Sequence, residues 1–132
     1  RRKQGNILIQ TFRPKDEIFE FLRKHDIENF LVEQKQNRQD AKMPPFYVLA
    51  KITFSDAKKE VSLKRSQAFY RYSKKNFTGD SNFAPAFFPR THGRYHFHVF
   101  LRHMDKEVSV DFLRGLKFGD GVVIDMGPSS LL

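Results

Sequence analysis

The stretch Gly93–Arg102 places the strongest constraint on the fold, because its apolar residues recur at every second position. Successive side chains of a β-strand point to opposite faces of a sheet, so this pattern predicts a strand with two distinct faces. The face expected to cover a core carries Tyr95, Phe97, Val99 and Leu101, and the mixed, basic face carries His96, His98, Phe100 and Arg102. Pro85, Pro89 and Gly93 exclude a helix just before this strand.

The chain after Pro45 supplies elements that pair with this strand or cover it. Strand character is found in segments 46–54, 82–89, 93–102 and 122–126, and helical character in segments 58–75 and 105–116. The second helix begins at Asp105 or Ser109, either of which is a suitable N-cap. The apolar face expected for the first helix consists of Val61, Leu63, Ala68, Phe69 and Tyr72.

The order of these elements is strand, helix, strand, strand, helix, strand. This is the split βαβ, ferredoxin-like arrangement. We therefore predict an α+β domain: a two-layer sandwich in which two helices cover one face of a four-stranded antiparallel sheet.

Residues 1–43 form a separate N-terminal part of the predicted organisation. Residues 6–12 are apolar enough for a strand covered on both faces, and we expect that strand to belong to another domain. Pro14 favours a helix start, and Asp26 favours the N-cap of a second helix that runs to about Lys42. Pro44 and Pro45 stop it, so we predict a tail and helical connector over 1–43 and a C-terminal α+β domain over 44–132.

Positive charge is concentrated in one part of the sequence. The chain has 132 residues and a net charge of +9, and residues 58–94 hold 9 basic and 2 acidic side chains. A local excess of this kind favours a polyanionic partner, nucleic acid first and an acidic peptide second, over a merely soluble basic surface. No apolar run is long enough to span a membrane and no signal peptide is evident, so a cytoplasmic location is expected.

Catalytic and metal-binding patterns are weak. The sequence has no cysteine, no phosphate-binding Gly-rich loop and no local nucleophile motif, so we predict no catalytic residue in this chain. His92, His96, His98 and His103 are the only candidates for metal ligands, and no carboxylate is clustered with them. Tetrahedral zinc needs three or four ligands, so we expect no metal site.

Nucleic-acid binding has better support. Arg90 and Arg94, flanked by Phe87 and Phe88, which we expect to be exposed, form the leading candidate site, because arginines contact phosphates. The basic helix adds Lys64, Arg65, Arg71, Lys74 and Lys75. Tyr95 and Phe100 are further candidates for stacking on an unpaired base. The alternative is that Tyr95 and Phe97 are simply core, and we favour this alternative for Phe97.

Several short segments, in order along the chain, resemble one family. The segments are Gly5–Thr11 with Pro14, His25-Asp26 with Phe30 and Arg38, Pro44-Pro45-Phe46, Pro85-Ala86 with Arg90, Gly93-Arg94-Tyr95, and Ile124-Asp125 with Pro128. Together they resemble the C-terminal end of the PriA family of replication restart helicases.

This resemblance implies a fragment of an ATP-dependent DNA helicase that acts at stalled forks. ATP, magnesium and zinc would bind upstream of these residues, and this fragment would have no cofactor or enzymatic activity of its own. The C-terminal domain would help to bind fork or single-stranded DNA and other primosome proteins. The family also docks the acidic C-terminal tail of single-stranded DNA-binding protein, for which Arg102, Lys106 and Arg114 are the candidates.

Three functions therefore remain open: a DNA-binding domain, a module that mainly docks this acidic tail, and a free-standing basic ferredoxin-like protein, such as one that binds RNA. The non-Met first residue and the unpaired strand expected at 6–12 argue against the third.

Overall fold

The computed structural model describes residue 5 and residues 7–128. These residues divide into two compact units, with the division between Asn37 and Arg38. The division falls inside a helix and lies upstream of the boundary predicted after residue 43. That boundary between a connector and a C-terminal domain stays a prediction.

The first unit consists of an extended segment and two helices, α1 (Ile18–Lys24) and the larger part of α2 (Ile27–Asp40). Asp26 caps α2 as predicted, since its carboxylate accepts a hydrogen bond from the Asn29 backbone N–H at 3.3 Å. His25, in the left-handed conformation with φ 52°, separates the two helices. The rings of Phe21 and Phe30 pack across this corner, 5.8 Å apart.

Residues 7–12 form no strand in this structure, and Asn6 lies outside the described residues. The strand expected over residues 6–12 was assigned to another domain, so it stays a prediction. The Ile7 and Leu8 side chains are 89% and 97% exposed. A strand needs a partner to receive its backbone hydrogen bonds, and no described residue supplies one to this segment. Apolar composition alone therefore did not make the segment a strand.

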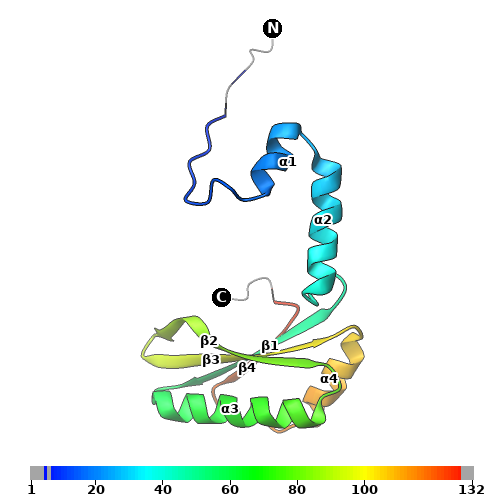
Figure 1. Ribbon diagram of the computed structural model, residues 1–132. Coiled ribbons are helices and arrows are strands. Elements are labelled where there is room, and N and C mark those ends of the chain that lie inside the picture. Colours follow the sequence, from blue (N-terminus) through cyan, green and yellow to red (C-terminus); the bar gives the residue numbers. More distant parts are fainter. Residues whose placement is uncertain (1–4, 6, 129–132) are drawn as a thin grey trace. The chain divides into compact units, whose positions relative to one another are not determined.

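The second unit is the predicted α+β sandwich (Figure 1). Its strands are β1 (Val48–Asp56), β2 (Asp80–Thr91), β3 (Arg94–His103) and β4 (Val122–Met126), and its helices are α3 (Lys59–Asn76) and α4 (Lys106–Arg114). The strand order is β2-β3-β1-β4, and every neighbouring pair is antiparallel. This is the ferredoxin-like topology, so the predicted fold class is confirmed.

The core lies between the sheet and the two helices, which cover the same face (Figure 1). Val99 and Leu101 of β3 are fully buried there, as their alternation predicted. Asp105 caps α4 by accepting a hydrogen bond from the Glu107 backbone N–H at 2.9 Å. The remaining buried members of the core are Ala50, Ile52, Phe54, Phe69, Phe77 and Leu113.

The buried face of α3 differs from the one predicted. Phe69 is buried, but Val61, Ala68 and Tyr72 are exposed. Serines take the buried positions instead: Ser62, Ser66 and Ser73 are fully buried. Their small side chains let the helix approach the sheet, and their hydroxyls donate to the carbonyls of Phe54, Leu63 and Tyr70.

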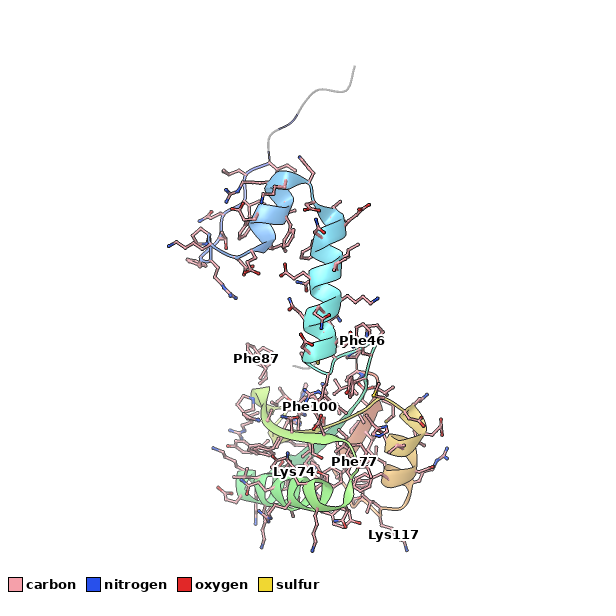
Figure 2. All side chains as sticks on the ribbon, turned by 45° about the vertical axis from the view of Figure 1, so that its right-hand side comes forward. Phe46, Lys74, Phe77, Phe87, Phe100 and Lys117 are labelled. Atoms are coloured by element: carbon pink, nitrogen blue, oxygen red, sulfur yellow. The ribbon has the colours of Figure 1, made fainter. Side chains whose placement is uncertain are left out.

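The sheet face away from the helices is also more buried than predicted. His98 and Phe100 of β3 are only 6% and 7% exposed, and Leu49 of β1 is 2% exposed. Figure 2 shows Phe100 on the side of the sheet opposite Phe77. The expectation that Phe100 is available for stacking on a base is therefore wrong, because a ring buried in the middle of the sheet presents no free face.

Candidate nucleic-acid interface

The β2–β3 hairpin carries the leading candidate site, and an irregularity in its pairing shapes it. Pro85 pairs with Phe97 and Arg90 pairs with Tyr95, so five steps along β2 lie opposite two steps along β3. The extra residues form a bulge that contains Phe87 and Phe88. Figure 2 shows the Phe87 side chain standing clear of the ribbon at this end of β2.

Phe87 and Phe88 form a pair of exposed rings on this bulge. Their side chains are 67% and 66% exposed, and the two rings meet edge to face with centroids 4.9 Å apart. They therefore contribute little to the core, in contrast to Phe97, which is 6% exposed and stacks on Phe83.

Hydrogen bonds within the hairpin and to the neighbouring strand β1 hold its turn end in place. One nitrogen of the His96 ring, Nε2, lies 2.7 Å from Thr91 Oγ1 on β2, and the other, Nδ1, lies 2.8 Å from Ser55 Oγ on β1. Arg94 donates from Nη2 to the Ser55 carbonyl oxygen at 3.1 Å. The position of the hairpin is therefore fixed by β1 as well as by its own pairing.

The two arginines predicted for DNA binding lie on this hairpin and are exposed. The Arg90 guanidinium sits 5.3 Å from the centroid of the Tyr95 ring, a cation–π contact. Tyr95 is half-buried, and Arg90 covers one face of its ring. This is the ring that was expected either to stack on a base or to join the core.

The turn Gly119–Gly121 lies close to two of the predicted cations. Arg94 Nη2 is 3.0 Å from the position that a Cβ would occupy at Gly121, and Arg65 Nη2 is 3.4 Å from the same position at Gly119. The structure thus places Arg65 and Arg94 at one turn although they are distant in sequence. Asp120, between the two glycines, is the carboxylate of this turn.

The other basic residues of α3 point in different directions. Lys64, Arg71 and Lys75 share one face of α3, because they follow one another at intervals of two turns and one turn. At about 100° per residue, this face lies about half a turn from the buried serines. Lys74 lies toward β2, with its Nζ 5.9 Å from the centroid of the Tyr70 ring. The predicted set therefore divides into an outward row on α3 and a group at the hairpin and the Gly119–Gly121 turn.

A groove between α3 and the segment after α4 was not predicted. It has a volume of about 360 Å³, and Arg65 and Lys117 are the two cations that line it. Phe118 lies beside Phe69, with ring centroids 5.6 Å apart. The remaining lining is mostly apolar: Phe54, Ala68, Tyr72, Leu116, Gly119 and Val122. The sequence feature that could have indicated this groove is segment 116–118, in which a lysine stands between two apolar residues.

The three residues predicted to bind an acidic tail are not brought together. Arg102 lies on the sheet face away from the helices, where its Nη1 donates to Asn82 Oδ1 at 2.5 Å. Lys106 and Arg114 are the first and last residues of α4, which covers the other face. Arg114 also lies 3.7 Å from Asp111 in an exposed ion pair.

His98 is buried in surroundings that strongly affect its protonation. Burial, and then the nearby charges of Lys51 and His96, lower its pKa to about 4. Its Nδ1 lies 3.0 Å from Thr53 Oγ1.

In the part of the chain that the structure describes, no three His, Cys, Asp or Glu residues gather as metal ligands would. Among the same residues, none of the helices is long and apolar enough to cross a membrane.

Comparisons with known proteins place the chain near one replication protein. No protein-family model matches it. It is 25% identical to the replication restart protein PriA of Bacillus subtilis (strain 168) over 104 residues, which cover 76% of this chain. The match covers only 13% of that protein, so this chain spans a small part of its relative's length. The chain is therefore distantly similar to a replication restart protein, in agreement with the resemblance of its motifs.

Proposed function

We propose that this chain is the C-terminal DNA-binding part of a replication restart helicase and that it binds fork or single-stranded DNA. The observation that carries the proposal is the β2–β3 hairpin, on which Arg90 and Arg94 are exposed while no acidic residue occurs between Asp80 and Asp105. The distant similarity to PriA of Bacillus subtilis supports it.

Two groups of cations would contact the phosphates. Arg90 and Arg94 provide planar guanidinium groups, each of which can donate two parallel hydrogen bonds to the oxygens of one phosphate. Lys64, Arg71 and Lys75 form a row about 16 Å long on α3, by the rise of about 1.5 Å per residue, which is enough to follow several phosphates of one strand. Arg65 and Lys74 flank this row.

The rest of the proposed activity would lie outside these 132 residues. ATP, magnesium and zinc sites, and the contacts with other primosome proteins, are implied by the resemblance alone. We expect that the purified chain does not hydrolyse ATP, with or without fork DNA. ATP hydrolysis that co-purifies with the chain would contradict the assignment of the ATP site to another part of the protein.

Fluorescence anisotropy with labelled fork DNA across a salt series tests the proposal. We expect affinity to fall steeply with salt, by about 0.9 log unit per log unit of salt for each duplex phosphate contact. Arg90→Ala combined with Arg94→Ala should weaken binding at least about tenfold, whereas Arg23→Ala combined with Arg114→Ala removes the same charge elsewhere and should have little effect. Equal losses in the two double variants, or no binding by the unaltered chain at low salt, would contradict the proposal.

A second function is favoured by the groove beside α3. Its apolar lining with Arg65 and Lys117 suits a short acidic peptide with an apolar end, such as the acidic tail of single-stranded DNA-binding protein. The groove replaces Arg102, Lys106 and Arg114 as the better candidate for this contact, because it brings cations and apolar side chains together.

A labelled acidic peptide that ends in Phe tests this second function. Lys117→Glu should weaken peptide binding and leave hairpin-dependent DNA binding unchanged, because Lys117 is exposed and lies on the groove. Lys106→Glu reverses the same charge on α4 and serves as the control. Peptide affinity that both variants lower equally would point to general electrostatic attraction instead.

A further inference from the structure

The exposed Phe87–Phe88 pair has no structural role that explains it. Both rings lie in the bulge, outside the regular pairing that resumes at Arg90. Each is about two-thirds exposed, whereas the other rings of the sheet, such as Phe83 and Phe97, pack against each other. Two adjacent aromatic side chains left in water give up the free energy that burial of their apolar surface would provide, which favours a binding role for this surface.

The geometry of the pair leaves ring faces open. The two rings are perpendicular, with an interplanar angle of 90° and centroids 4.9 Å apart. In this arrangement the edge of one ring covers a single face of the other, so each ring keeps at least one face free. A flat, apolar group can therefore stack on the pair without displacing either side chain.

The charge around the pair selects an anionic ligand. Arg90 and Arg94 are exposed on the same hairpin, and the segment between Asp80 and Asp105 has no carboxylate. A ligand that combines flat apolar faces with regularly spaced negative charge is a nucleic-acid strand whose bases are unpaired. The bases of a duplex are already stacked on one another, so they present no face to these rings.

The hairpin is held in place before any ligand binds. His96 bridges Thr91 and Ser55, and Arg94 donates to the Ser55 carbonyl oxygen, so the turn end of the hairpin is tied to β1. Arg90 rests on Tyr95. Binding would then order few additional side chains, which reduces its entropic cost.

We propose that Phe87 and Phe88 stack on unpaired bases of single-stranded DNA while Arg90 and Arg94 contact the neighbouring phosphates. This inference rests on the proposed DNA-binding function and assigns the hairpin to the single-stranded part of the DNA.

Anisotropy of the full chain with labelled oligo(dT) and with a labelled duplex of equal length tests the inference. Phe87→Ala combined with Phe88→Ala should lower affinity for oligo(dT) about tenfold or more, because stacking on one base contributes that much, and should leave duplex affinity unchanged. Phe87→Leu combined with Phe88→Leu keeps apolar area without aromatic faces and should show most of the loss. Phe12→Ala removes a fully exposed ring elsewhere and should have no effect.

A direct readout of stacking is the fluorescence of 2-aminopurine placed in the single strand. It should be quenched by the unaltered chain and less so by the Leu double variant. Full oligo(dT) affinity in a folded Ala double variant would overturn the stacking role while leaving the proposed function intact. Equal losses on oligo(dT) and duplex, full affinity in the Leu variant, or equally strong Phe-dependent binding of a poly-Glu peptide would also overturn it. A chain that binds neither DNA would instead refute the proposed function itself.

Discussion

His98 shows how a single buried side chain links the fold to pH. Its ring is 6% exposed in the middle of β3, and its pKa is lowered to about 4 by burial first and by Lys51 and His96 second. An unfolded chain binds a proton at the ordinary histidine pKa of about 6.5. Between about pH 6.5 and pH 4 the unfolded state therefore holds a proton that the folded state does not.

We expect the free energy of unfolding to fall on acidification from pH 6.5 toward pH 4, by at most about 1.4 kcal/mol per pH unit from this group. Urea unfolding at pH 7 and pH 5 measures the change. His98→Gln removes the titrating ring and keeps a polar group near Thr53, so its stability should depend less on pH over this interval. The same pH dependence in both proteins would show that His98 is not responsible.

Gly79 is a residue at which one added methyl group should matter, although its φ is not positive. A Cβ at this position would overlap the carbonyl oxygen of Arg102 and come within 2.6 Å of Phe77 Cε1. The close approach of these segments thus requires the absence of a side chain.

Gly79→Ala should lower the free energy of unfolding by about 1–3 kcal/mol, the usual cost of overpacking. Gly115→Ala is the matched control, because its Cβ would meet nothing closer than 3.7 Å and its φ is −70°. Urea unfolding of both variants distinguishes them. A Gly79→Ala protein as stable as Gly115→Ala would contradict the close contact.

At the scale of elements, the packing of α3 on the sheet depends on small side chains. Ser62, Ser66 and Ser73 are fully buried, and each donates its hydroxyl hydrogen to a backbone carbonyl. The helix therefore approaches the strands closely at these positions, and Phe69 supplies most of the apolar bulk on this face.

Ser66→Leu should destabilise the domain by about 1–3 kcal/mol, because a larger side chain forces α3 away from the sheet. Gln67→Leu, one position along on an exposed part of the same helix, should change stability by about 0.5 kcal/mol or less. Thermal unfolding followed by circular dichroism measures both. A tolerated Ser66→Leu would place the buried face elsewhere on α3.

At the scale of the whole molecule, charge and candidate sites are concentrated in the second unit. From Arg38 onward the chain has 16 basic and 9 acidic residues, a net charge of +7 out of +9. The hairpin, the outward row of α3 and the groove all belong to this unit. Arg38 itself is tied to it, since its carbonyl oxygen accepts from the Met43 N–H and its Nη1 donates to the Pro44 carbonyl oxygen.

We expect a chain that begins at Arg38 to fold alone, with a free energy of unfolding close to that of the full chain, and to keep the hairpin-dependent DNA binding. A chain that begins at Val48 loses the ion pair between Lys42 and Asp80 and should be less stable. Urea unfolding and anisotropy of the two truncated proteins measure this. Failure of the longer one to unfold cooperatively would mean that the first unit is needed for the fold.

Local patterns were sufficient to determine the order of the elements after Pro45. Alternation over 93–102, helical spacing over 58–75 and the caps at Asp26 and Asp105 are short-range properties, and each element formed close to its expected bounds. The antiparallel ferredoxin-like sheet followed from that order. Arg90 and Arg94 were placed on one hairpin for the same reason, because they are four residues apart.

Burial and proximity were decided only by the tertiary structure, because they depend on which distant segments meet. The serines of α3 are buried because the sheet lies against them, and Ser62 donates to the Phe54 carbonyl of β1. Residues 7–12 form no strand because no described residue pairs with them. The bulge that exposes Phe87 and Phe88 arises from the register of β2 on β3. The groove with Arg65 and Lys117 likewise exists only where α3 meets the segment after α4, which no periodicity in either segment specifies.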